Sequence, residues 1–324
     1  MECIPGVTDL KRVRDIIAPY IHKTPVHSSR ALDTICGCSL FFKCEQFQKV
    51  GAFKFRGATH AVMTLDKKEA LKGVATHSSG NHAQALALAA RNRGITAHIV
   101  MPQNAPKVKV EAVVSYGGII TFCQPTLPDR EATLQKVRKQ TGAVEIHPYN
   151  DYRIIAGQAS AAAELYDDVP DLDCLIAPVG GGGLLSGSIL STKYFSKHTK
   201  VYGAEPDQAN DAWQSFKQKK LIPVEKALTI ADGLRTSLGS LTFPIIADGA
   251  EDILCVQEAT IIRAMMLIWE RMKLIVEPSA AVPLAAVLEH PAVFAGKRAG
   301  IILSGGNVDL MNLPWLDPQH FGKH

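Results

Sequence analysis

Residues 174–187 have the sequence CLIAPVGGGGLLSG, an apolar run followed by four consecutive glycines. Apolar residues in succession predict a strand that is buried on both faces, as in a parallel sheet. The small and apolar residues after the glycines predict a helix. Glycines leave their backbone N–H groups open to a ligand, and the N-terminus of a helix carries partial positive charge. This stretch therefore predicts an α/β fold with an anion-binding turn, suited to a phosphate, at Gly180, Gly181, Gly182 and Gly183.

The same alternation of strand and helix runs through the whole chain. Strands are predicted at residues 39–44, 73–77, 96–100, 117–123, 174–179, 200–205, 252–256 and 299–304, and helices at residues 82–93, 130–140, 155–167 and 259–272. Such alternation is typical of an α/β protein whose mostly parallel sheet is covered by helices on both faces. Ligands of such sheets bind at the carboxyl ends of the strands. The residues that directly follow each strand are therefore the candidates for a functional site.

One of these loops, THSSGNHAQ at residues 76–84, is unusually polar. It places Ser78, Ser79, Asn81 and His82 where a helix begins. A simple helix cap needs only one such residue. Several hydrogen-bonding groups at a helix N-terminus suit a carboxylate or a phenolate oxygen, so this loop predicts a second anion site.

Two further loops carry candidate site residues. In GAFKFRG, residues 51–57, Lys54 lies between two phenylalanines. Burial lowers the pKa of an amine and makes it a nucleophile, although a lysine on a half-buried surface is the commoner explanation of this segment alone. The segment SGGN at residues 304–307 is another polar glycine turn after a predicted strand.

Other nucleotide-binding loops share some of these features. A P-loop needs Gly-Lys-Ser/Thr at its end, where this chain has two leucines. Gly181, Gly183 and Gly187 miss the G-x-G-x-x-G spacing of a dinucleotide loop by one residue. Glu205 ends a strand about 20 residues later, where a ribose-binding acid would lie. A nicotinamide-dependent oxidoreductase is therefore a rival interpretation of these two features, but it does not explain the other loops.

Composition and charge exclude several classes of protein. The chain has 324 residues, a length typical of about two domains, and 47% of them are hydrophobic. Its net charge of +4 is too small and too dispersed to indicate nucleic acid or an anionic membrane as a partner. No apolar stretch reaches the ~18–20 residues of a spanning helix, and seven scattered cysteines predict neither disulfides nor a zinc site. We therefore expect a soluble, cytoplasmic protein without nucleic-acid or membrane partners.

An anion-binding turn, a carboxylate-binding loop and a candidate imine-forming lysine together suggest pyridoxal phosphate acting on an amino acid. The segments FQKVGAFKFRGA, THSSGNHAQALA, APVGGGGLLSG and ILSGGNVDL resemble those of fold-type II pyridoxal-phosphate enzymes, and best the serine racemase and serine/threonine dehydratase branch. The order and spacing fit from about Thr24 to Leu310. The resemblance implies two open, twisted, mostly parallel α/β domains, similar to tryptophan synthase β. A large cofactor-binding domain would span residues 1–72 and 150–324, and a small mobile domain residues 73–149.

The resemblance also implies a role for each motif residue. Lys54 would carry the cofactor as a Schiff base, with Phe53 packed near it. Asn81 would hydrogen-bond the pyridine hydroxyl oxygen and Ser304 the pyridine nitrogen, while the four glycines would hold the phosphate. The residues that would bracket the substrate carboxylate are Ser78, Ser79, Asn81 and His82.

The chemistry implied by the resemblance allows two outcomes. Lys54 would remove the α-proton from one face of the substrate, and Ser79 would serve the opposite face, which gives racemisation. Loss of a β-hydroxyl instead gives a keto acid and ammonia. The leading expectation is a serine racemase that also converts serine to pyruvate and ammonia. The alternative is a threo-3-hydroxyaspartate ammonia-lyase, whose second substrate carboxylate would need a cation such as Arg130 or Arg153. A catalytically inactive amino-acid-binding protein with this fold is a further alternative.

Residues 202–211, YGAEPDQAND, contain carboxylates and backbone carbonyls directly after a strand. Such oxygen ligands suit a hard divalent cation, although a solvated acidic loop is the commoner explanation of the residues alone. In the serine racemase-like enzymes that the chain resembles, the ligands fall on Glu205, the carbonyl of Ala209, and Asp211. This implies magnesium, or calcium or manganese in its place, in a structural or activating role. The resemblance also implies a homodimer.

Overall fold

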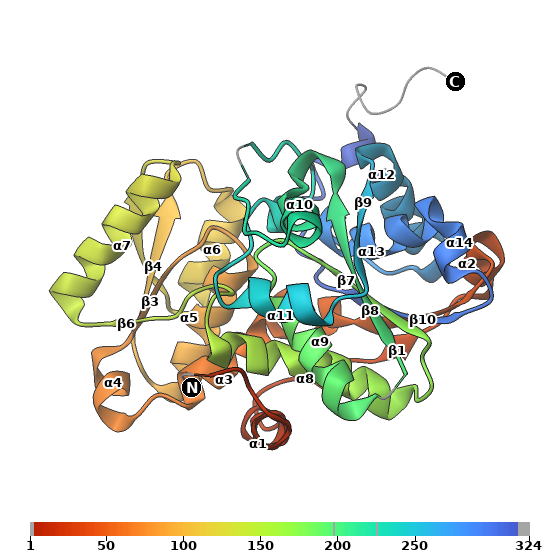
Figure 1. Cartoon of the computed structure of the whole chain (residues 1–324). Coiled ribbons are helices and arrows are strands. Elements are labelled where there is room, and N and C mark those ends of the chain that lie inside the picture. Colours follow the sequence, from red (N-terminus) through yellow and green to blue (C-terminus); the bar gives the residue numbers. More distant parts are fainter. Residues whose placement is uncertain (1–2, 197, 225, 317–324) are drawn as a thin grey trace.

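The structure, a computed structural model, describes residues 3–316 except 197 and 225, and contains two open sheets (Figure 1). The larger sheet has six strands in the order β1-β2-β10-β7-β8-β9. Neighbouring strands are parallel except β1, which pairs antiparallel with β2. The strands are β1 (Val26–His27), β2 (Ser39–Cys44), β7 (Cys174–Pro178), β8 (Lys200–Pro206), β9 (Asp252–Val256) and β10 (Arg298–Leu303).

The smaller sheet has four parallel strands in the order β5-β4-β3-β6. They are β3 (Val74–His77), β4 (Ala97–Pro102), β5 (Ile119–Cys123) and β6 (Val144–Glu145). The mostly parallel α/β fold is thus confirmed, with fold-type II topology. All four small-sheet strands lie between residues 73 and 149, the span predicted for the small domain; the division into domains itself stays a prediction.

Helices cover both faces of each sheet because successive strand residues point to opposite sides. On β10, Ile301 joins the apolar core beneath α12 and α13, whereas Ile302 joins the core beneath α1, α8 and α9. On β4, Ile99 packs with α5 and Val100 with α7. The helices are α1 (Val7–Ile17), α2 (Arg30–Cys36), α3 (Lys54–Met63), α4 (Lys67–Lys72), α5 (Asn81–Arg93), α6 (Lys107–Ser115), α7 (Leu127–Thr141), α8 (Tyr152–Asp168), α9 (Gly183–Phe195), α10 (Asp211–Gln218), α11 (Thr242–Gly249), α12 (Glu258–Leu267), α13 (Pro278–Glu289) and α14 (Pro291–Phe294). Among the described residues, no helix combines the length and the hydropathy needed to cross a lipid bilayer.

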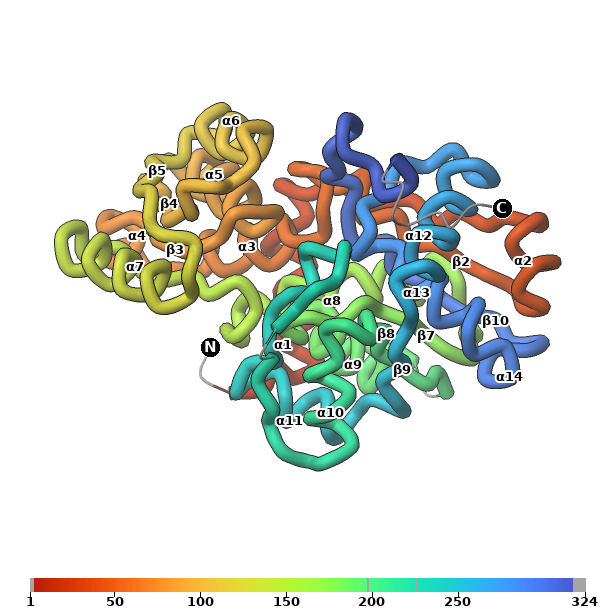
Figure 2. Tube along the Cα trace, turned by 90° about the horizontal axis from the view of Figure 1, so that it is seen from above, coloured from red at the N-terminus to blue at the C-terminus, as the bar shows by residue number. Residues whose placement is uncertain are grey.

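Helix α3, whose first residue is Lys54, lies between the elements of the two sheets (Figure 2). It packs against α5 on one side and α8 on the other. Phe55 and Val62 of α3 belong to the same apolar core as Ile99 of the small sheet. Small residues allow the close contact with α8, because a Cβ on Gly57 or Gly157 would meet backbone atoms of the other helix within 3 Å.

A buried ion network anchors α3 to the elements around the large sheet. The guanidinium of Arg56 donates from Nε to Glu45 Oε2 at 2.6 Å and from Nη1 to Glu164 Oε1 at 2.7 Å. Lys43 Nζ donates to Glu164 Oε2 at 2.7 Å, and Thr24 Oγ1 donates to Glu45 Oε1 at 2.5 Å. Every charge in this network has an opposite partner, as buried charges require. The network therefore fixes the position of α3, and with it the backbone of Lys54.

Candidate active site

The predicted site residues lie at the carboxyl ends of strands in both sheets. The SSGN loop, residues 78–81, follows β3, and the four glycines follow β7. The Glu205–Asp211 segment lies at the end of β8, and Ser304 follows β10. Lys54 begins α3, which is reached from the end of β2. This is the edge at which ligands of open parallel sheets bind.

The side chain of Lys54 is half-buried. Its Nζ donates to Pro148 O at 3.0 Å and lies 5.2 Å from the centre of the Phe53 ring. Burial lowers the pKa of Lys54 to about 8, and the nearby Glu277 carboxyl opposes the shift. Phe53 N donates to Ser304 O at 3.0 Å. The backbone directly before the lysine is therefore bonded to the SGGN turn, which is far away in the sequence.

The glycine turn before α9 is buried, and none of the described side chains caps this 13-residue helix. A Cβ on Gly181 would lie 2.3 Å from the ring of Tyr149, and Gly182 has a φ of 87°, so neither position accommodates another residue. A buried helix N-terminus without partners leaves several N–H groups unsatisfied. An anion such as a phosphate would satisfy them, which fits the role predicted for these glycines.

The helix after the SSGN loop, α5, is also without a side-chain cap among the described residues. Ser78 Oγ accepts from Gly80 N at 3.3 Å. The imidazole of His82 is buried and its Nε2 bonds Ile146 O at 3.1 Å, while burial lowers the pKa of His82 to about 3. The ring is neutral, and its Nε2 already donates to Ile146 O. The backbone N–H of His82 is therefore the group of this residue that remains to donate to a carboxylate. Ser79 lies directly beside this free helix end.

Asn81 joins the small-sheet helix α5 to the large-sheet elements. Its Nδ2 donates to Glu277 Oε1 at 3.0 Å and to Oε2 at 3.1 Å. Its Oδ1 accepts from Asn307 Nδ2 at 2.9 Å. Ser304, predicted at the pyridine nitrogen, is 3% exposed in the same turn as Asn307. No sequence motif indicates Glu277. The one feature of the sequence that could have drawn attention to it is its position directly before the proline that begins α13.

Aromatic and imidazole rings form a second group that the motifs did not indicate. His147 Nδ1 accepts from the backbone N of Tyr149 at 3.3 Å and of Asn150 at 2.9 Å, and the His147 and Tyr149 rings meet edge to face at 4.6 Å. His77 packs on His147 with ring centres 6.5 Å apart. Since Tyr149 also covers Gly181 and Gly183, this group connects the glycine turn to the small sheet.

Arg130 and Arg153, the two residues considered for binding the second carboxylate of 3-hydroxyaspartate, differ in whether their charge is already paired. Arg153 Nη2 donates to Asp151 Oδ2 at 2.7 Å, so its charge is already paired. Arg130, in the first turns of α7, has a buried Nε without a partner among the described residues. Its positive charge contributes to the lowered pKa of His77, a shift caused mainly by burial. Arg130 therefore lies near the His77–His147 group with donor capacity to spare.

The expected cation ligands are close together and buried. Glu205 accepts from Ala212 N at 3.0 Å and Trp213 N at 2.8 Å, and both carboxylate oxygens of Asp211 lack a partner among the described residues. Burial raises the pKa of Asp211 to about 7, and burial together with Asp211 raises that of Glu205. Within the described part of the chain, no group of three or more His, Cys, Asp or Glu is arranged to hold a metal. The expected set has only two carboxylates, and Asp211's free oxygens fit a hard cation.

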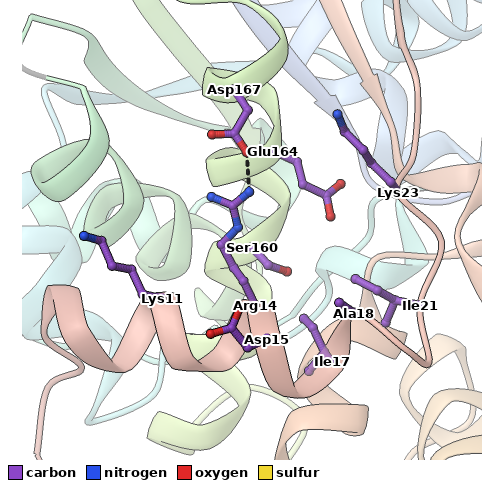
Figure 3. Close-up of a pocket in the computed structure, with 10 residues that line it drawn as sticks. All are labelled: Lys11, Arg14, Asp15, Ile17, Ala18, Ile21, Lys23, Ser160, Glu164 and Asp167. Atoms are coloured by element: carbon purple, nitrogen blue, oxygen red, sulfur yellow. Dashed lines mark hydrogen bonds and ion pairs between the residues drawn. The ribbon is translucent and has the colours of Figure 1, made fainter.

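A surface cavity of about 580 Å³ lies elsewhere, between α1 and α8 (Figure 3). Arg14 and Asp167 form an ion pair on its wall, and Glu164 at its base is held by Arg56. None of the predicted site residues lines it. The cavity borders the network that anchors α3, not the Lys54 site.

Known proteins similar to this chain identify its family. Residues 17–305 match the family model described as pyridoxal-phosphate dependent enzyme. The chain is 48% identical over 312 residues to the beta-hydroxyaspartate dehydratase of Paracoccus denitrificans, covering 96% of this chain and 99% of the relative. It is 49% identical to the serine racemase of Arabidopsis thaliana over 95% of this chain and 94% of the relative. The structure of maize serine racemase superimposes with a TM-score of 0.94 at 45% identity, covering 98% of each chain.

The half-buried lysine, the uncapped helix N-terminus after four glycines and the second uncapped helix N-terminus fit pyridoxal phosphate and an amino-acid carboxylate. The family match extends over most of the chain, and the relatives cover nearly all of it. The chain belongs to the pyridoxal-phosphate dependent enzymes of fold type II, in the branch of the serine racemases and serine/threonine dehydratases.

Proposed function

We propose that this enzyme interconverts L- and D-serine and also eliminates water from serine to give pyruvate and ammonia. The observation that carries the proposal is the place of Lys54, a half-buried amine that donates to Pro148 O, beside the Tyr149 that covers the glycine turn, and whose charge acts on His82 at the start of α5. The serine racemase relatives support serine as the substrate. Both outcomes need one α-proton to be removed, so one site serves both.

Each residue has a part in the proposed reaction. Pyridoxal phosphate, when bound, supplies an electron sink for the electrons left by the α-proton. Lys54 would hold it covalently, with Phe53 beside it, and would serve as the base on one face of the substrate once the substrate's amine has displaced it and left it as a free amine. A pKa near 8 leaves a useful fraction of this amine neutral at pH 7. Gly180, Gly181, Gly182 and Gly183 hold the phosphate, and Asn81 and Ser304 orient the ring.

Ser79 is the proposed acid and base for the opposite face. It lies at the uncapped N-terminus of α5. At the same helix end, Ser78, Asn81 and the backbone N–H of His82 would bind the substrate carboxylate. The partial positive charge at this helix end stabilises a carboxylate and favours release of a hydroxyl proton. Racemisation needs a proton on each face, whereas elimination needs only the first removal and loss of the β-hydroxyl.

A second candidate is elimination from threo-3-hydroxyaspartate. The buried, unpartnered Nε of Arg130 and the 48% identical beta-hydroxyaspartate dehydratase favour it. A guanidinium near the His77–His147 group would bind the second carboxylate of that substrate, and serine has no such group.

We also propose a divalent cation, magnesium or in its place calcium or manganese, at Glu205, Asp211 and the carbonyl of Ala209. Its role would be structural, because it would neutralise two buried carboxylates at the end of β8. A homodimer, a cytoplasmic location and closure of a small domain at residues 73–149 over the substrate complete the proposal.

The test begins with the purified enzyme. A visible absorbance band that borohydride removes, leaving the label on Lys54, identifies the cofactor link. Chiral chromatography of residual serine, beside a pyruvate assay, then measures racemisation and elimination. The same assay with L-threo-3-hydroxyaspartate, scoring oxaloacetate, ranks the two substrates. A coloured enzyme that turns over neither substrate would refute the proposed function but not the family.

A further inference from the structure

Glu277 is a buried carboxyl group in the active site that the proposed mechanism does not use. It is 4% exposed and directly precedes α13. Both carboxyl oxygens accept from Asn81 Nδ2, at 3.0 and 3.1 Å. Its Oε1 lies 2.7 Å from where a Cβ on Gly305 would be, so the carboxyl lies against the turn that contains Ser304.

Glu277 and Asn307 together fix the orientation of the Asn81 amide. Asn307 Nδ2 donates to Asn81 Oδ1 at 2.9 Å and to Val50 O at 2.7 Å, so this Asn307 group can only donate. Glu277 accepts on the opposite end of the amide. Because a reversed amide would place donor against donor, Asn81 must present its N–H₂ group on the Glu277 side. One of the two N–H groups there remains for another acceptor.

We propose that Glu277 is a positioning residue for the cofactor: it orients Asn81 as a donor to the pyridine hydroxyl oxygen and places a carboxyl group along the ring edge between Asn81 and Ser304. The proposal rests on the assignment of Asn81 and Ser304 to the cofactor. A carboxyl group keeps an oxygen that accepts from Asn81 whether or not it carries a proton. Its charge, by contrast, changes the electrostatic potential at the ring edge.

The groups around Glu277 determine when it is charged. Burial and the nearby Asp232 raise the pKa of Glu277 to about 7, while the hydrogen bond from Asn81 and the positive charge of Lys109 oppose this. Lys54 is a further cation that senses Glu277. Lys109 Nζ and Asp232 Oδ2 are themselves paired at 2.6 Å, on α6 and on the short helix Asp232–Leu234. The two partly exposed charges of this pair act on Glu277 in opposite directions.

The charge pair offers a test with opposite signs. In the holoenzyme, the absorbance and fluorescence of the bound cofactor are titrated with pH. Asp232→Asn should move the spectral midpoint to lower pH, and Lys109→Gln to higher pH, each by about half a unit or more. Glu277→Gln should abolish that transition. Glu270→Gln, an exposed carboxyl on the preceding segment, is the matched control and should titrate like the wild type.

Positioning is tested separately through Asn307→Asp. The change removes the donor to Asn81 Oδ1, so cofactor affinity, measured by dialysis and fluorescence, should fall about tenfold, equivalent to one hydrogen bond of about 1.4 kcal/mol. Unchanged affinity would overturn the positioning role.

The remaining outcomes are also decisive. Identical midpoints in the Asp232→Asn and Lys109→Gln variants, no transition in the wild type, or a transition retained in Glu277→Gln would overturn the placement of Glu277 at the ring edge. Both members of the pair reach the surface, so their variants decide the question even if Glu277→Gln does not fold. A wild-type protein without the visible band would instead refute the assignment of Asn81 and Ser304 to the cofactor.

Discussion

Replacing Lys54 by methionine should stabilise the cofactor-free protein at neutral pH. Burial lowers the pKa of Lys54 from 10.5 to about 8, so below pH 8 the folded state must hold a charge that it disfavours. Methionine fills a similar volume without that charge. A residue required for the proposed chemistry is therefore expected to reduce the stability of the fold that carries it.

The magnitude follows from the pKa difference. A shift of 2.5 units corresponds to about 3.4 kcal/mol. The side chain keeps part of its hydration, and Lys54→Met loses the bond to Pro148 O, so the net gain at pH 7 is about 2 kcal/mol. For 324 residues the unfolding entropy is about 0.7 kcal/mol per kelvin, and the melting temperature should rise by about 3 °C.

The pH dependence gives the prediction its sign. Between pH 8 and 10.5 the unfolded chain binds more protons at residue 54 than the folded protein, so the wild type gains stability as the pH rises. The advantage of Lys54→Met should therefore be full at pH 7 and nearly gone by about pH 9.5. Thermal unfolding of both proteins without cofactor, at these two pH values, measures it. Lys136→Met, at an exposed position on α7, should show no such difference.

If Lys54→Met is no more stable than the wild type at pH 7, or if its advantage does not change with pH, burial does not lower the pKa of Lys54. Something other than burial would then have to keep Lys54 in its neutral form at neutral pH. The proposed base would lose its physical support, although the family would not be in question.

Three further predictions test the other parts of the site. Ser79→Ala should abolish D-serine formation and elimination from D-serine but keep conversion of L-serine to pyruvate, since each face is protonated only by its own group; undiminished racemisation would assign the second face to another acid. Chelation should lower activity and melting temperature, with magnesium or calcium restoring both, and Glu205→Ala and Asp211→Ala should mimic it; no effect of any of these would show that no cation binds these two buried carboxylates. Arg130→Met should lower kcat/KM about a hundredfold for 3-hydroxyaspartate and less than threefold for serine. The control Arg153→Met should affect both substrates equally, and equal losses in the Arg130 variant would remove that residue from the substrate site.

The main strands could be predicted from the sequence because each is a short apolar run bounded by turn residues. Residues 39–44 and 252–256 form strands with the predicted bounds, and the other six runs differ from the structure at one or both ends. Strands β1 and β6 were not predicted, since two residues carry no periodicity. The helix predicted at 259–272 begins as α12, but its last turn, Ile268–Met272, is a π-helix that the apolar spacing does not distinguish.

The site was predictable only where its residues lie together in the sequence. The SSGN loop and the four glycines follow strands directly, so sequence order and sheet topology bring them to one edge. Glu277 reaches Asn81 across 196 positions. Tyr149 covers the glycine turn through a segment without a motif. Such contacts depend on how the two sheets pack. The choice between Arg130 and Arg153 depended instead on a local side-chain conformation, because the Asp151 carboxylate at the start of α8 turns toward Arg153, two residues later.

Several of the unsatisfied groups in the described residues, though not all of them, lie at the edge where the strands end. The Arg56 network, which holds α3, has a partner for every charge. By contrast, Lys54 carries a disfavoured charge. Among the described residues, α5 and α9 begin without side-chain caps and neither carboxylate oxygen of Asp211 has a partner. Each of these needs would be met by a ligand of the proposed function: the cofactor's aldehyde for the amine, its phosphate and the substrate carboxylate for the helix ends, and a cation for the carboxylates. Binding that removes such costs adds its free energy to the stability of the fold. The loops at this edge should therefore exchange their amide hydrogens fastest without ligands, and their protection should rise in steps as cofactor, cation and substrate are added, while α3 stays protected throughout.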